Sequence, residues 1–127
     1  MPPVKTALAI AVAGAFGALA RWGVGTWFGD RFPSFAWGTL AVNVSGSFLL
    51  GVLFAVLIER TGASPTLRLA LTTGLMGAYT TFSTFSLETF RMFEDGAYGA
   101  AFANVGLSLV LGLGAVWAGV SLGRAMT

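Results

Sequence analysis

The chain has 127 residues, of which 56% are hydrophobic and only 9% are charged, and its net charge is +2. A soluble domain carries about 25% charged residues, so this composition excludes an ordinary soluble protein and indicates a membrane protein. The basic residues are scattered rather than clustered, which excludes nucleic acid as a partner. The chain has neither Cys nor His. It therefore lacks thiolate chemistry and the commonest general base, and we expect no enzymatic activity.

Four apolar stretches are long enough to cross a bilayer, which requires about 20 apolar helical residues. We expect transmembrane helices over residues 6–28, 35–58, 67–93 and 98–122. The segments between them are short and rich in turn-forming residues, so residues 1–127 are expected to form a single membrane domain. A barrel is not expected, because barrel strands alternate in hydropathy over about 10 residues, whereas these runs are continuous.

The first stretch follows a short N-terminus with one Lys, which raises the alternative of a signal peptide. The run from Thr6 to Phe28 is longer than the core of a signal peptide, about 7–15 residues, so we interpret it as a transmembrane helix. Its one charge, Arg21, costs roughly 2.5–3.5 kcal/mol near the bilayer centre. We expect Arg21 either to pair with Glu88 or to draw anions into a vestibule. Glu88 has a second possible partner in Arg91, three residues further along the chain.

The second stretch has no charged residue but carries Asn43 near its middle, with Ser47 one turn further. An amide within hydrocarbon requires hydrogen-bond partners. Two interpretations remain open. Asn43 either bonds to a neighbouring helix, which is worth about 0.6–2 kcal/mol, or donates its N–H groups to a passing anion.

The third stretch is the least ordinary, because five hydroxyl residues lie within seven positions and two glycines precede them. Gly weakens a helix interior by about 1 kcal/mol relative to Ala, and hydroxyls can satisfy backbone groups that a break frees. We predict a broken helix whose free carbonyls can bind a cation. A flexible but continuous helix, with hydroxyls bonded to its own carbonyls, is the alternative. The residues are Gly74, Gly77, Thr80, Thr81, Ser83, Thr84 and Ser86.

Aromatic and polar residues extend this pattern into the fourth stretch. Phe82 and Phe85 are three residues apart on one helix face. The edge of a phenyl ring carries partial positive charge and can hold an anion, although core packing is the commoner role of such a pair. Asn104 and Ser108 lie one turn apart in the fourth stretch and form a second polar stripe. This stripe serves either helix packing or an ion pathway.

The distribution of charge bears on orientation and assembly. Four spans place both termini on one side of the membrane, and the basic residues are only weakly biased toward that side. A weak bias permits insertion in both orientations, and so permits an antiparallel homodimer. Four helices fill their own interior with side chains, so a channel of this length is expected to be an oligomer. The terminal side has Lys5, Arg60, Arg68 and Arg124, the opposite side has Arg31 and Arg91, and Arg21 leans toward the latter.

The motifs together resemble those of the Fluc/CrcB family of fluoride channels over essentially the whole chain. The run in the third stretch is the most specific, and its spacing from the Asn of the second stretch strengthens the match. The matching segments are Gly17-Ala-Leu-Ala-Arg21, Gly38-Thr-Leu-Ala-Val-Asn43-Val-Ser-Gly46 and the run from Gly74 through Phe85, which contains Thr-Thr-Phe-Ser-Thr-Phe.

The resemblance implies a passive, fluoride-selective channel of the cell inner membrane that protects the cell from fluoride. It implies an all-α, polytopic, dual-topology homodimer with four transmembrane helices per subunit and a break in the third. It also implies a structural Na⁺ at the dimer centre, held by backbone carbonyls of Gly77 and Thr80. Arg21 would lie at the base of a vestibule, with Glu88 as a second structural charge. The fluoride pathway would be lined by Asn43, Phe82, Phe85, Thr84, Asn104 and Ser108.

One position departs from the family pattern: some relatives carry Tyr where this chain has Asn104. An amide is still a donor, so the polar track can continue through it. The partners implied are fluoride, the lipid bilayer and a second copy of the chain.

Two other classes of protein fit part of the pattern. A small dual-topology exporter of cationic drugs would need a carboxylate in its first span, where this chain has only Arg21. A structural membrane subunit would explain the glycines but not the cluster of hydroxyl and aromatic residues, and a fluoride flux measurement separates it from a channel. A membrane enzyme ranks lower because the sequence lacks a nucleophile and base pair.

Overall fold

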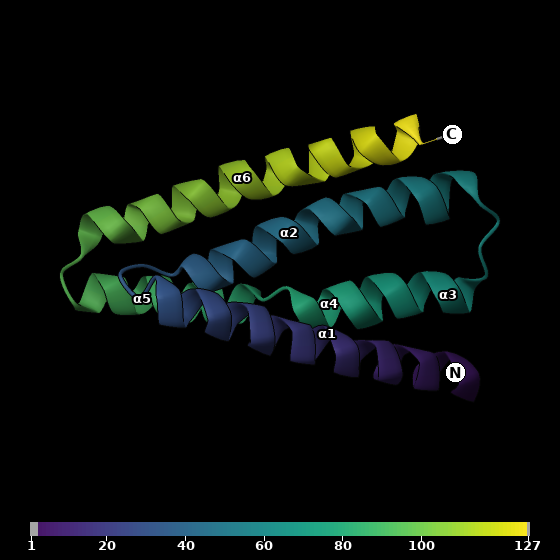
Figure 1. The fold of residues 1–127 in the computed structure, drawn as a ribbon, viewed down its shortest axis with the longest axis horizontal. Helices are drawn as coiled ribbons and strands as arrows, with labels where there is room; N and C mark the ends of the chain where they lie inside the picture. The colour runs from purple at the N-terminus through teal and green to yellow at the C-terminus, as the bar shows by residue number, and fades with distance from the viewer. Residues whose placement is uncertain (1–2, 127) are drawn as a thin grey trace.

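Helices form the whole architecture of residues 3–126, the part of the chain that the computed structural model describes, and this part contains no strand. The helices run lengthwise beside one another, and the start of the first lies at the same end as the finish of the last (Figure 1). This arrangement agrees with an even number of crossings.

Three helices are long and apolar enough to cross a membrane: Val4–Arg31, Trp37–Arg60 and Tyr98–Ala125, with mean hydropathies of 1.6, 2.2 and 2.0. The first is α1, Val4–Arg31. The second joins α2, Trp37–Leu53, to the π-helical η1, Phe54–Arg60, and the third is α6, Tyr98–Ala125. At about 1.5 Å per residue each exceeds the roughly 30 Å of a hydrocarbon core. The prediction of an all-α, multi-pass membrane protein is therefore confirmed.

A further helical region lies between η1 and α6, and it is interrupted. It begins with α3, Pro65–Leu69, where Pro occupies the first turn and the Ser64 hydroxyl accepts the N–H of Leu67. The helix continues through the π-helical η2, Ala70–Met76, and α4, Gly77–Tyr79. Thr80 and Thr81 are extended, and α5, Phe82–Glu94, follows them. The break lies where the glycines and hydroxyl residues predict it.

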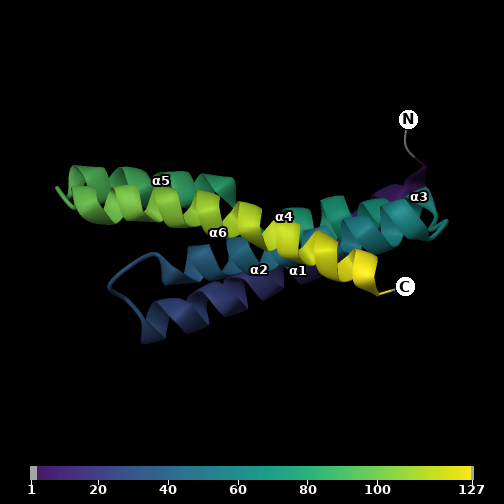
Figure 2. The same cartoon turned by 90° about the horizontal axis from the view of Figure 1, so that it is seen from above.

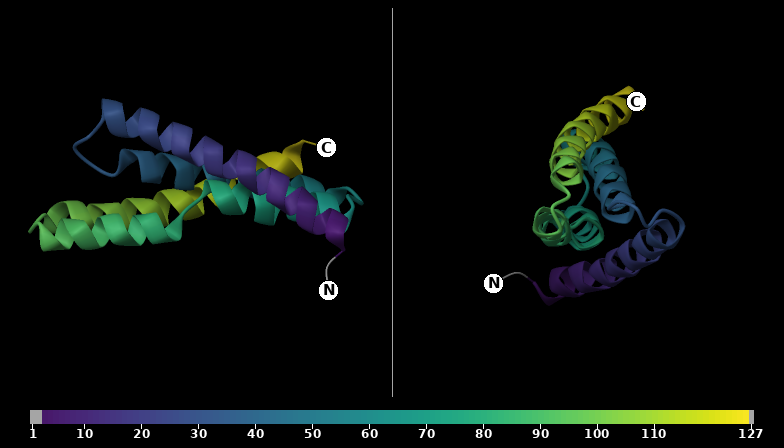
Figure 3. Two further views of the ribbon diagram at one scale, coloured as in Figure 1. Left: turned by 90° about the horizontal axis from the view of Figure 1, so that it is seen from below. Right: turned by 90° about the vertical axis from the view of Figure 1, so that its left-hand side faces the viewer.

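The helices pack through glycines that let backbones approach closely. α2 lies between α6 and α1 in the views of Figures 1 and 3. A Cβ on Gly51 of α2 would lie 2.6 Å from the carbonyl oxygen of Val116 in α6. A Cβ on Gly74 of η2 would lie 2.8 Å from the carbonyl oxygen of Ile10 in α1. α5 packs on α6, and Figure 2 shows this pair diverging from α1 and α2 toward the end remote from the termini.

Most large apolar side chains of the described residues face outward, and the buried core is small. Val42, Met76 and Tyr79 form its central cluster. By contrast Phe16 is 65% exposed and Trp117 is 74% exposed. A soluble protein rarely exposes contiguous apolar surface on this scale. The outward surface suits lipid or another copy of the chain.

Candidate functional site

The break between α4 and α5 is joined to α2 by Asn43. The amide oxygen of Asn43 accepts the backbone N–H of Thr81 at 2.7 Å, and its Nδ2 donates to the carbonyl oxygen of Thr81 at 3.0 Å. Both backbone groups of Thr81 are thus satisfied within the bundle, as a break in hydrocarbon requires. The Asn43 nitrogen carries two hydrogens, so one remains for a ligand. The structure therefore shows Asn43 bonded to a neighbouring segment, which is the first of its two interpretations. The remaining N–H keeps the second interpretation, donation to an anion, possible.

Among the described residues, the break also leaves the backbone carbonyls of Gly77 and Thr80 without a hydrogen bond. In a continuous helix the N–H of Thr81 would bond to the carbonyl of Gly77, but here it bonds to Asn43. The carbonyl of Ala78 accepts the Nε–H of Arg21 at 3.2 Å. Within residues 3–126 no hydrogen bond reaches the carbonyl oxygen of Gly77 or Thr80. A helix C-terminus carries partial negative charge, so these two oxygens fit a hard cation.

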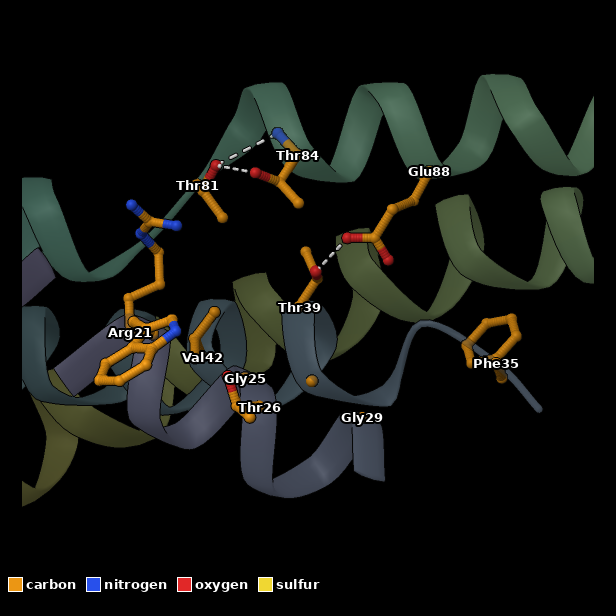
Figure 4. A pocket seen from close by; sticks show the side chains of 12 residues that line it. Arg21, Gly25, Thr26, Gly29, Phe35, Thr39, Val42, Thr81, Thr84 and Glu88 are labelled. Atoms are coloured by element: carbon orange, nitrogen blue, oxygen red, sulfur yellow. Dashed lines mark hydrogen bonds between the residues drawn. The ribbon is translucent and has the colours of Figure 1, made fainter. Parts of the chain in front are cut away.

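A pocket of about 280 Å³ opens between α1, α2 and α5 on one side of the break. Arg21 lies at its end near the break and Glu88 at the other, with Thr84 between them on α5 (Figure 4). The pocket therefore combines one cation, one carboxylate and hydroxyl groups. Its remaining lining is Trp22, Gly25, Thr26, Gly29, Phe35, Gly38, Thr39, Val42 and Thr81.

Arg21 and Glu88 line this pocket without pairing. Glu88 Oε1 accepts a hydrogen bond from the hydroxyl of Thr39, while Arg21 donates to the backbone carbonyl of Ala78. Among the described residues the one ion pair within 4 Å joins Arg124 to Glu59 at 2.9 Å. The expected ion pair of Arg21 with Glu88 is thus not formed. The alternative ion pair, of Glu88 with Arg91, is not formed either. The physical reason is that each charged group reaches a nearer polar group on a neighbouring element.

A second pocket, of about 210 Å³, lies on the other side of the break and contains Asn43, Ser47 and Phe82. Phe82 is 79% exposed, and its ring centroid lies 5.7 Å from that of the half-buried Phe85. The pocket thus contains both Asn43 and Phe82, and Phe85 lies beside Phe82 without lining the pocket. The pocket also includes Gly46, Leu50, Thr80 and Thr81.

Thr81 is the residue that the sequence prediction left out of the site. It lines both pockets. Its hydroxyl accepts the N–H of Thr84 at 3.2 Å and donates to the Thr84 hydroxyl at 3.0 Å, which caps the start of α5. The sequence carries a signal for this role, since Thr is a preferred N-cap residue and Thr81 directly precedes Phe82, the first residue of α5.

Asn104 and Ser108 lie apart from this arrangement. Asn104 is 1% exposed, and its Nδ2 donates to the hydroxyl of Thr89 at 2.9 Å, which ties α6 to α5. The Thr89 hydroxyl in turn donates to the carbonyl of Phe85 at 2.8 Å. Ser108 is half-buried, and neither residue lines either polar pocket. A single chain therefore brings together only part of the predicted pathway.

Comparison with known proteins gives a match along most of the chain. The family described as "CrcB-like protein, Camphor Resistance (CrcB)" matches residues 8–120. A protein of Acidobacterium capsulatum named "Fluoride-specific ion channel FluC" is 49% identical over 116 residues, which cover 91% of this chain and 93% of that one. The protein of the same name from Geobacter sulfurreducens is 48% identical over 125 residues, with 95% and 98% covered.

A third relative of that name, from Methylococcus capsulatus, is 52% identical over 120 residues. The match covers 91% of this chain but 51% of the relative, so the chain spans about half the length of that protein.

Proposed function

The chain belongs to the CrcB-like family, and from this we propose that it is a fluoride-specific ion channel of the cytoplasmic membrane. The observation that carries the proposal is its similarity, at 48–49% identity over more than nine tenths of both chains, to proteins named as such channels. It is a multi-pass membrane protein with a transport function rather than an enzyme. Passive outflow of fluoride, driven by an inside-negative potential, would protect the cell.

The proposed pathway runs along the break. Fluoride is strongly hydrated, so donors must replace its water within the membrane, yet bind weakly enough for release. The free N–H of Asn43 and the ring edges of Phe82 and Phe85 supply such donors without a full charge. Thr84 and Arg21 line the pocket across the break, and Arg21 would attract anions into it.

Ser108 and Asn104 of α6 have different roles in this proposal. Ser108 is half-buried and lines neither polar pocket of its own chain, so its contact with fluoride would be made in an assembled dimer. Asn104 is buried and bonded to Thr89, whose hydroxyl reaches the backbone of Phe85. We therefore propose that Asn104 supports the pathway by fixing Phe85, and contacts fluoride only if α5 moves.

We further propose that the interrupted region from α3 to α5 is a fourth transmembrane segment, and that two copies assemble antiparallel. The outward apolar surface and the 79% exposure of Phe82 in the single chain support a second copy. The weak bias of basic residues between the two ends permits both orientations.

A structural Na⁺ at the centre of this dimer is part of the proposal. The free carbonyl oxygens of Gly77 and Thr80 suit it, because hard cations prefer several oxygen ligands. Two carbonyls are too few for one ion, so the second copy would supply the same two groups. Such an ion would add fixed positive charge beside the anion path.

The test of function is fluoride efflux from liposomes that contain the purified protein. Phe82→Ile is expected to reduce efflux at least about tenfold, since the aliphatic side chain has no positive ring edge. Phe16→Ile, on the exposed face of α1, is the matched control and is expected to retain full efflux. Equal efflux by both variants would remove Phe82 from the pathway.

A further inference from the structure

Tyr79, the last residue of α4, has a buried hydroxyl that the proposed pathway does not use. Its side chain is 9% exposed and packs with Val42 and Met76. Its hydroxyl oxygen lies 2.8 Å from that of Ser45 on α2. Ser45 also bonds to the carbonyl of Ala41 at 2.6 Å, and a carbonyl only accepts. The one proton of Ser45 is thus committed, so Tyr79 is the donor in the bond between the two hydroxyls.

The bond between Tyr79 and Ser45 is the second link between α2 and the broken region, beside the bonds made by Asn43. On α2, Asn43 and Ser45 are two residues apart, and they hold Thr81 and Tyr79, also two residues apart. α2 therefore fixes the residues on both sides of Thr80. The close approach of the Tyr79 ring depends on a glycine, since a Cβ on Gly46 would lie 3.0 Å from ring atom Cδ2.

The two carbonyls proposed to hold Na⁺ are among those that would accept a backbone hydrogen bond if the helix were continuous. In such a helix the N–H of Thr81 would bond to Gly77, and the N–H of Thr84 would bond to Thr80. Here the first N–H is taken by Asn43 and the second by the Thr81 hydroxyl. The broken backbone and the free carbonyls are therefore one state, and the continuous helix is the competing state.

We propose that Tyr79 is a positioning residue for the Na⁺ site, which holds the end of α4 in the broken state through its hydroxyl bond to Ser45. The inference rests on the Na⁺ site of the proposed function. Na⁺ and the hydroxyl bond stabilise the same backbone state, so loss of the bond lowers the apparent affinity for Na⁺ without removing a ligand.

The experiment measures thermal unfolding of the purified full-length protein across Na⁺ concentrations, with choline replacing Na⁺ at constant ionic strength. Tyr79→Phe and Ser45→Ala each remove one hydroxyl and are expected to raise the half-maximal Na⁺ concentration about threefold or more. The double variant is expected to shift it no further than the single variants, because both remove the same bond. Tyr98→Phe, at an exposed tyrosine, is the control and is expected to leave it unchanged.

A purely packing role would give a different result: Tyr79→Phe would lower the melting temperature equally at every Na⁺ concentration, and the inference would be overturned. Absence of any Na⁺ effect on the unmodified protein would overturn both the Na⁺ site and the role of Tyr79. Fluoride efflux from the same preparation separates these failures from a failure of the channel function. At saturating Na⁺, efflux by Tyr79→Phe is expected to return to that of the unmodified protein.

Discussion

At the scale of single residues, Asn43 combines an observed structural role with a proposed functional one. Its oxygen and one N–H form hydrogen bonds with the peptide groups of Thr81, and the residue lines the pocket that also contains Phe82. The sequence left a structural and a functional interpretation of this amide open. The geometry makes them compatible, because an amide side chain has more hydrogen-bonding groups than either task needs.

Asn43→Ala is expected to destabilise the protein strongly, since it leaves the N–H and the carbonyl of Thr81 without partners. Each unsatisfied group costs about 1–3 kcal/mol when it is buried. Ser47→Ala, in the same pocket, is the control and is expected to change stability by less than about 0.5 kcal/mol. Thermal unfolding in detergent measures both. Equal stability of the two variants would mean that the bonds to Thr81 contribute nothing.

Reversal of the charges at Arg21 and Glu88 tests whether these residues act as a pair. Since each bonds to a different partner, we expect the double reversal to restore neither the stability nor the efflux that the single reversals lose. The ion pair of Arg124 with Glu59 provides the matched case, in which double reversal is expected to recover the stability that each single reversal loses. Recovery in the Arg21 and Glu88 pair would contradict the geometry of the pocket.

At the scale of elements, local chemistry predicts the break better than it predicts its contacts. Glycines followed by a run of hydroxyl residues place the interruption at Thr80 and Thr81, and the structure has it there. The bonds that hold it depend on the relative register of helices distant in sequence. A single sequence contains no signal for that register. The links from Asn104 to Thr89 and from Tyr79 to Ser45 were therefore not predictable.

The contact of α6 with α2 gives a prediction at this scale. A Cβ on Gly119 would collide with the backbone carbonyl of Phe48, which cannot rotate away as a side chain can. Gly119→Ala is therefore expected to destabilise by about 1–3 kcal/mol. Gly114→Ala, on the same helix with open space around it, is expected to be neutral or slightly stabilising. Equal stability of the two variants in thermal unfolding would contradict the close packing of α2 on α6.

At the scale of the whole molecule, composition and motif were enough for the class and the family. The high apolar content predicted a multi-pass helical protein, and the motif around Thr80 through Phe85 predicted the family. The predicted pathway could not be judged in the same way, because a single chain brings only some of its residues together. Ser108 lines neither polar pocket of its own chain and Phe82 is 79% exposed, as expected if a second copy completes the site. A single sequence describes one subunit, so an interface between subunits is beyond its local patterns.

The most direct test of the channel function is ion efflux from liposomes that hold the unmodified protein, with an imposed inside-negative potential and no pH gradient. Our account expects fast fluoride efflux that increases with the potential, and no chloride efflux under the same conditions. Efflux of both anions would contradict the selectivity that we assign to the donors of the break. Absence of fluoride efflux from folded protein would contradict the channel function itself.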